Sequence, residues 1–141
     1  MGKEYRFIIP GRAYSGQGKS ATRYKAKIRK IAARIIAQPL TQDFLHLKVD
    51  YFHLGRHRVD RDNLLKCISD GLKGVAYNDD SQIGHAEAFD HDTTSSFTYE
   101  EPISPEIEDW LHKGEEFVAV VIRLRHILRI EVFTSKAPAS S

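Results

Sequence analysis

The sequence predicts an α+β fold, a mixed β-sheet of about four or five strands with two main helices packed on it. Residues 22–38 and 63–72 carry apolar side chains at helical spacing, and other stretches carry them at every second position. The chain has 141 residues, of which 41% are hydrophobic and 28% charged, as expected for one folded domain. We therefore expect a single domain over residues 1–133 and a disordered tail over residues 134–141.

The N-terminal part of the chain predicts a strand followed by a basic helix. Residues 4–10 alternate well enough for a strand that ends at Pro10 and Gly11. The helix over 22–38 ends before Pro39. Its predicted apolar stripe consists of Ile28, Ile31, Ala32, Ile35 and Ile36. Lysine and arginine occupy much of the remaining surface of this helix.

Two alternating stretches in the middle of the chain predict strands. Residues 45–54 place Leu45, Leu47 and Val49 on one side and polar residues on the other. Residues 82–89 alternate in the same way, and we expect this strand to run antiparallel to an earlier one.

The C-terminal part predicts one short helix and a closing strand. Ser104 is a good N-cap, and Gly114 is a good helix terminator. Trp110 is expected to anchor the buried edge of this helix. Residues 117–124 are strongly β in character, and residues 127–133 form either a bulged continuation or a short extra strand.

The distribution of charge along the chain is uneven. The formal net charge is +2, yet residues 1–37 hold ten lysines and arginines against one acid. Residues 38–141 hold eleven against eighteen. A basic part that binds phosphates beside an acidic part that holds a metal suits a nuclease, although a solvated lysine-rich helix face gives the same pattern.

Several classes of protein do not fit the sequence. No apolar run is long enough for a membrane span, and the first residues lack the apolar core of a signal peptide. Cys67 is the only cysteine, which excludes an internal disulfide and suits the cytoplasm. The Gly16-x-Gly18-Lys19-Ser20 segment is not a P-loop, because position 13 is alanine where the first glycine is required, so no nucleotide cofactor is expected.

Residues 60–82 hold the densest cluster of carboxylates, together with Lys66. Asp62, Lys66 and Asp70 are spaced four apart, so they share one face of the helix predicted over 63–72. Asp62 is expected to cap that helix. Asp60 precedes Asp62 by two positions, so in an extended chain the two carboxylates point the same way.

Clustered carboxylates of this kind suit a hard cation. Mg²⁺ takes one or two protein carboxylates and keeps its other positions for water and phosphate. A turn over residues 77–80 can bring Asp79 and Asp80 back toward the helix. The alternative is an ordinary capped surface helix with ion pairs from Asp62 to Lys66 and from Lys66 to Asp70.

The same residues resemble the signature of the RusA family of Holliday-junction resolvases. The matching positions are Asp60-x-Asp62-Asn63-x-x-Lys66, Asp70-Gly71-Leu72 and Asp79-Asp80-x-Gln82. The resemblance implies a RusA-like nuclease domain that forms a homodimer, requires Mg²⁺ (with Mn²⁺ as a substitute) and resolves four-way DNA junctions by paired symmetric nicks.

The resemblance also assigns roles to residues. It implies that Asp60, Asp62 and Asp80 are the essential aspartates that hold the metal, that Asp79 supports them, and that Lys66 is the essential lysine. The metal would activate a water molecule for attack on the phosphodiester.

Basic residues on both sides of the motif are candidates for contact with DNA phosphates. They lie in the loop after the first strand, on the basic helix and in the loop before Asp60: Arg12, Lys19, Arg23, Lys27, Lys30, Arg56 and Arg58.

Other functions remain open from the sequence alone. The same chemistry suits a nuclease acting on flaps, forks or single strands. A non-catalytic DNA-junction-binding module, or a protein with a purely structural metal, would also carry these residues. Zinc is disfavoured at His53 and His57, and equally at His85, His91 and Asp92, because no cysteine lies nearby and hard oxygen ligands dominate.

Overall fold

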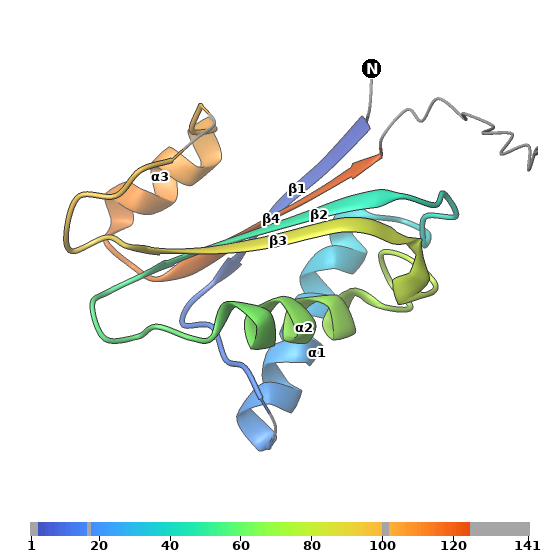
Figure 1. Ribbon diagram of the computed structural model, residues 1–141, viewed down its shortest axis with the longest axis horizontal. Coiled ribbons are helices and arrows are strands. Elements are labelled where there is room, and N and C mark those ends of the chain that lie inside the picture. The colour runs from blue at the N-terminus through green and yellow to red at the C-terminus, as the bar shows by residue number, and fades with distance from the viewer. Residues whose placement is uncertain (1–2, 17, 100–101, 125–141) are drawn as a thin grey trace, which may run out of the picture.

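The computed structural model describes residues 3–16, 18–99 and 102–124, and it confirms the α+β class (Figure 1). Within these residues one four-stranded sheet has the order β1-β4-β2-β3. In chain order the elements are β1 (Lys3–Pro10), α1 (Lys19–Ile35), β2 (Leu45–His53), α2 (Arg61–Leu72), the 3₁₀ turn η1 (Asp80–Gln82), β3 (Ile83–Asp92), α3 (Pro105–Lys113) and β4 (Phe117–Leu124).

The sheet is mixed because one of its three strand pairs is parallel. β4 pairs antiparallel with both β1 and β2, whereas β2 and β3 are parallel. The expectation that residues 82–89 form an antiparallel strand is therefore wrong. The chain leaves the end of β2, returns through α2, and so enters β3 at the same end of the sheet at which β2 began, which is the crossover that a parallel pair requires.

Two layers of side chains lie on opposite faces of this sheet. Figure 1 shows α1 and α2 below the sheet and α3 above it. The larger core lies between the sheet and the pair α1 and α2, and includes Leu47, Tyr51, Leu64 and Ile68. A smaller cluster of Phe52, Ile107, Phe117 and Ala119 lies beneath α3.

Helix α1 begins three residues earlier than predicted, and its buried stripe is displaced. Gly18 occupies the N-cap position, and the helix ends at Ile35. The side chains of α1 that the sheet and α2 bury are Ala21, Tyr24, Ile28 and Ala32. Ile35, predicted to belong to the stripe, is 44% exposed. Gly71 of α2 permits close approach to α1, because a Cβ at this position would lie 3.1 Å from the Ile28 side chain.

The predicted helix near the C-terminus is confirmed together with both of its caps. The Ser104 side chain accepts a hydrogen bond from the Ile107 amide, and Pro105 is the first helical residue. Gly114 ends α3 in the left-handed conformation that glycine adopts most readily. Trp110 is partly buried and packs on the smaller cluster, as predicted.

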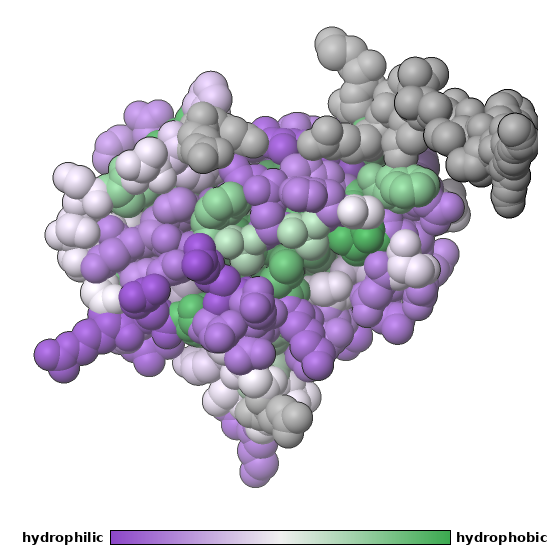
Figure 2. All heavy atoms as spheres, viewed as in Figure 1, coloured by the Kyte–Doolittle hydropathy of each residue, from purple (hydrophilic) through white to green (hydrophobic). Residues whose placement is uncertain are grey.

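The predictions for residues 127–133 and for the tail at 134–141 lie outside the described residues. Within the described ranges, no helix is long and apolar enough to cross a membrane. Figure 2 shows that hydrophilic residues cover most of the face in view, with hydrophobic atoms visible mainly in a band across its middle.

The burial pattern of α1 generates a test of the fold. Replacing Ile28 with alanine should lower the free energy of unfolding by about 2–5 kcal/mol, because a fully buried side chain leaves a cavity between α1 and α2. The matched control is Ile35→Ala on the same helix, which should change it by no more than about 0.5 kcal/mol. Urea unfolding measures both, and equal losses would contradict the packing described.

Candidate active site

Helix α2 begins with a cap that differs from the predicted one. The cap is Asp60 and not Asp62, because Asp60 has extended backbone angles and its Oδ1 accepts hydrogen bonds from the amides of Asp62 and Asn63 at 2.9 and 3.1 Å. Asp62 lies in the first helical turn, where a carboxylate is favourable beside the positive end of the helix dipole. Asp60 and Asp62 therefore do not share an extended strand.

One face of α2 borders an open groove of about 330 Å³. Asp62, Lys66 and Asp70 line it at successive turns of the helix, as their spacing predicts, and Asp80 joins them from the turn before β3. Apolar side chains of the sheet, including Leu47 and Ala86, also line the groove.

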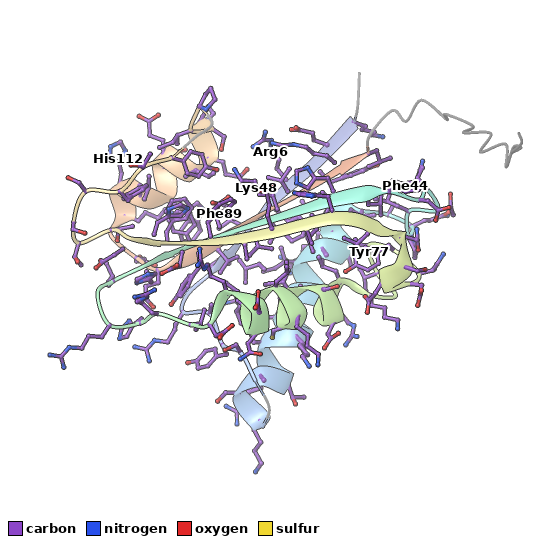
Figure 3. The ribbon with its side chains drawn as sticks, in the orientation of Figure 1. Arg6, Phe44, Lys48, Tyr77, Phe89 and His112 are labelled. Carbon is purple, nitrogen blue, oxygen red and sulfur yellow. The ribbon has the colours of Figure 1, made fainter. Side chains whose placement is uncertain are left out.

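A hydrogen-bond chain holds Asp80 against α2. The Ser69 hydroxyl donates to Asp80 Oδ1 at 3.2 Å. The Tyr77 hydroxyl donates to the Ser69 carbonyl at 2.9 Å and lies 2.8 Å from Ser69 Oγ. Burial raises the pKa of Tyr77 to about 12, so its hydroxyl stays a donor at neutral pH. Figure 3 shows Tyr77 on the α2 side of the sheet, near the turn that carries Asp80.

Asp79 lies beside Asp80, but its side chain caps the 3₁₀ turn and does not contact α2 through Ser69. It caps η1 by accepting a hydrogen bond from the Ser81 amide at 3.1 Å. Hydrogen bonds from the Ser81 hydroxyl and amide lower the pKa of Asp79, and Lys73 Nζ lies 3.7 Å from its carboxylate.

Buried Gln82 fixes the same turn by four hydrogen bonds. Its Oε1 accepts from the amides of Asn78 and Asp79 at 2.8 and 3.0 Å. Its Nε2 donates to the carbonyls of Leu40 and Gln42 at 2.8 and 3.0 Å. Gln82 therefore orders the turn that carries Asp79 and Asp80.

The ion pairs of an ordinary surface helix do not form along α2. In the described part of the chain, Lys66 pairs with neither Asp62 nor Asp70. Asp70 instead lies 3.5 Å from Lys25 of α1, and Arg29 donates to its backbone carbonyl at 3.3 Å. Within the same described ranges, Asp60, Asp62 and Asp80 make no ion pair. The groove therefore keeps the exposed carboxylates of Asp62 and Asp80 and the exposed Lys66, whereas Asp60 and Asp79 do not line it.

The donor set of the groove fits a hard divalent cation with a largely aqueous shell. All the candidate ligands are carboxylate oxygens, the type that Mg²⁺ prefers. They are spread along α2, since Asp80 contacts Ser69, which is about 10 Å along the helix axis from Asp62. Among the described residues, accordingly, no three of these carboxylates have their oxygens within 4.8 Å of one another. Mg²⁺ usually binds one or two carboxylates directly and keeps several water ligands, which can bridge to the other carboxylates.

Three of the predicted DNA-binding residues lie together around one hollow. Arg12, Arg23 and Lys27 line a hollow of about 340 Å³ together with Tyr14. The other predicted residues are all exposed: Lys19, Lys30, Arg56 and Arg58. Because Lys19, Arg23, Lys27 and Lys30 are three or four residues apart, they form one stripe on α1.

Three of these cations also have partners within the chain. Arg58 Nε lies 3.3 Å from Asp90, and Arg12 Nε lies 3.6 Å from Glu116. The Lys27 ammonium donates to the Pro10 carbonyl. These contacts orient the side chains without burying them.

Lys25 and Glu116 also lie at the site, although the sequence does not single them out. Lys25 lies with Lys66, Asn63 and Asp70 around a second hollow of about 230 Å³, next to the α2 groove. In the sequence, Lys25 looks like the other cations of the helix. It lies beside Asp70 only because α1 packs against α2.

Buried Glu116 connects the loop after β1, through Arg12, with the loop after β2, through Leu54 and His57. Its carboxylate accepts hydrogen bonds from the Leu54 amide at 2.8 Å and the Tyr51 hydroxyl at 3.2 Å, and its Oε2 lies 2.5 Å from His57 Nδ1. Burial acts to raise the pKa of Glu116, but the hydrogen bonds from Leu54 and His57 outweigh it, and the pKa lies below the usual value. One carboxylate thus holds the segment that leads into Asp60.

Glu116→Gln tests this connection. At neutral pH the variant should lose about 1–3 kcal/mol of stability. The buried acceptor becomes neutral, and one of its two oxygens is replaced by an NH2 group that cannot accept a hydrogen bond. A carboxyl with a lowered pKa contributes stability above its ordinary pKa of 4.5 that is lost as the pH falls through the lowered value. Thermal unfolding of both proteins from neutral to acidic pH should show the difference shrinking. A difference independent of pH would contradict this role.

Comparison with known proteins identifies the family of this chain. The family model described as Endodeoxyribonuclease RusA matches residues 11–108, more than half of the chain. The matched segment contains α1, β2, α2, η1 and β3, and hence every residue that lines the α2 groove. A search of curated proteins finds no match. The chain therefore belongs to the RusA family of endodeoxyribonucleases.

Proposed function

We propose that this endodeoxyribonuclease is Mg²⁺-dependent and resolves four-way DNA junctions by paired symmetric nicks. The observation that carries the proposal is the α2 groove, where Asp62, Lys66 and Asp80 are exposed together without an ion-pair partner in the described part of the chain. Charged side chains that form no ion pair within the chain add little to the stability of the fold. In this groove the carboxylates can bind a metal and the lysine can bind a phosphate.

The proposed metal ligands are Asp60, Asp62 and Asp80, directly or through water, with Asp79 in support. When bound, Mg²⁺ supplies a Lewis acid that lowers the pKa of water and offsets negative charge on the phosphoryl group. The chain prepares these ligands in advance. Backbone amides of α2 hold one oxygen of Asp60 and leave the other available, and Ser69 orients Asp80.

Lys66 is proposed to bind the scissile phosphate and to stabilise charge that develops on it. It lies one helical turn from Asp62 on the wall of the groove, so an ammonium and a carboxylate face the same space. Lys25 borders the adjoining hollow with Lys66, which extends the positive charge toward α1.

The DNA backbone is proposed to run from the groove onto the basic stripe of α1. The hollow lined by Arg12, Arg23 and Lys27 and the exposed Lys19 and Lys30 supply phosphate contacts on the same side of the sheet as α2. Arg56 and Arg58 supply contacts at the loop that leads into Asp60. Such contacts position a substrate without reading its sequence.

A homodimer is part of the proposal. Resolving a junction takes two nicks related by a two-fold axis, and two copies of one site in C₂ symmetry provide them. Light scattering after size exclusion measures the assembly, which should have twice the mass of the 16.1 kDa chain.

Cleavage of a labelled mobile four-way junction tests the chemistry. With Mg²⁺ or Mn²⁺ the protein should make paired nicks near the crossover, and Asp80→Asn should slow them by at least about 100-fold, because the groove loses a charged ligand. Asp62→Asn should abolish cleavage, while the variant still binds the junction. The matched control is Asp109→Asn, an exposed acid on α3, which should cleave at the normal rate.

The substrate panel separates the proposal from its alternatives. Linear duplex, flap and fork DNA are tested beside the junction. Faster cleavage of flaps or forks would replace junction resolution with another branched substrate. Junction binding by a verified dimer with no cleavage in either metal would show a binding module.

The basic stripe generates a prediction about binding. Arg23→Ala should weaken junction binding and reduce the slope of log affinity against log salt by about 1, because one phosphate contact is lost. Lys113→Ala is the matched control, since Lys113 is an exposed cation on α3 at the opposite face of the sheet. Fluorescence anisotropy over a series of salt concentrations measures both. Equal slopes for the two variants would remove the stripe from the DNA interface.

A further inference from the structure

The face of the sheet opposite the α2 groove carries a second group of potential metal ligands. Figure 3 shows Lys48 of β2 and Phe89 of β3 on the side of the sheet that faces α3. Side chains alternate along a strand, so His46, His85 and Glu87 lie on this same face. In the parallel register of β2 and β3, His46 is directly opposite His85, and Glu87 follows two residues later.

These three side chains converge on one point. His46 Nε2 lies 2.7 Å from Glu87 Oε2, and His85 Nε2 lies 3.5 Å from the same oxygen. The two imidazole rings meet edge to face with 4.6 Å between their centroids. One ligand atom from each residue falls within 4.8 Å of the others, and among the described residues no other three His, Cys, Asp or Glu side chains do so.

The burial of the three residues differs in a way that suits a bound ion. His46 is only 4% exposed, so its ring is held in place by the sheet. The side chains of Glu87 and His85 are 32% and 63% exposed, which leaves the group open to solvent on one side. A fixed inner ligand with two accessible outer ligands lets an ion enter and leaves a position for water.

We propose that His46, His85 and Glu87 form a binding site for Zn²⁺ or a similar borderline divalent transition ion, separate from the carboxylate groove. The sequence disfavours zinc at His85 because no cysteine lies nearby, but the fold brings His46 and Glu87 to it. Two imidazoles and one carboxylate are a donor set that zinc takes in proteins without cysteine, with water as the fourth ligand. Imidazole nitrogen favours zinc over Mg²⁺, which requires oxygen ligands, so the two faces of the sheet select different metals.

An ion at this position would join the edge strand β3 to β2. The ligands lie at the start of the parallel pair, next to the irregularity in register between Leu45 and His46. His85 is three residues after buried Gln82, which fixes the turn that carries Asp80. Zinc would therefore stabilise the beginning of β3 from the face opposite the groove.

Titration of the full chain with Zn²⁺ alone tests the proposal. With excess Mg²⁺ present to occupy the carboxylate groove, calorimetry should give one zinc site per chain, and zinc should raise the melting temperature. His85→Ala and Glu87→Gln should each raise the dissociation constant about 10- to 100-fold or more, since removal of a ligand costs at least as much as removal of a group that supports one. Co²⁺ should give the intense visible absorption of tetrahedral coordination in the unaltered chain and lose it in His85→Ala.

Two control variants make the result specific. His112→Ala, at an exposed histidine of α3, should bind zinc normally, and Asp80→Asn should also bind zinc normally because it alters only the opposite face. His85 is exposed, so its variant should fold, which its circular dichroism verifies. Zinc binding that is unchanged in His85→Ala, or lost in Asp80→Asn, would overturn the proposal. These readouts require no nuclease activity, so they stand independently of junction cleavage.

Discussion

The parallel pairing of β2 and β3 is the constraint on which the rest of the structure depends. Parallel strands require the chain to return across the sheet, and here α2 makes that return. The return lays α2 against the sheet beside β3, so the turn at the start of β3 meets the C-terminal half of the helix. Asp80 therefore faces the helix that carries Asp62 and Lys66, although it follows them by more than a dozen residues.

The groove keeps its charges available because neighbouring groups satisfy the other demands of the fold. Asp60 caps α2, Asp79 and Gln82 fix the turn, and α1 supplies Lys25 as the partner of Asp70. Glu116 holds the loop before Asp60 through the Leu54 amide. Each of these contacts removes a degree of freedom near the groove without neutralising Asp62, Lys66 or Asp80. Such preorganisation costs nothing at the moment of reaction, which is how charged groups are used efficiently in catalysis.

The same strand pair presents different chemistry on its two faces. Toward α2, carboxylates and a lysine border a groove with an apolar floor. Toward α3, the first residues of β2 and β3 bring two imidazoles and a carboxylate together. Since β3 is paired only with β2 among the strands in the described part of the chain, an ion shared between the two strands acts on the element that positions Asp80.

The sequence by itself determined the elements and the identity of the acidic motif. Apolar spacing predicts α1, α2, β2 and β4, and the caps of α3 follow from serine, proline and glycine, because these are local preferences of the backbone. The spacing of Asp62, Lys66 and Asp70 by four predicts their common face for the same reason. The resemblance of residues 60–82 to the family was likewise present in the sequence, and the family match confirms it.

Only the tertiary structure decided the direction of β3, the true cap of α2 and the partners of the charged residues. Apolar and polar residues alternate in the same way in a parallel and in an antiparallel strand pair. Asp60 and Asp62 are equally good helix caps by residue type. Lys25, Glu116 and the meeting of His46 with His85 depend on contacts between residues far apart in the chain. Local preference carries no information about such contacts, because the packing of helices on the sheet and the register of the strands create them.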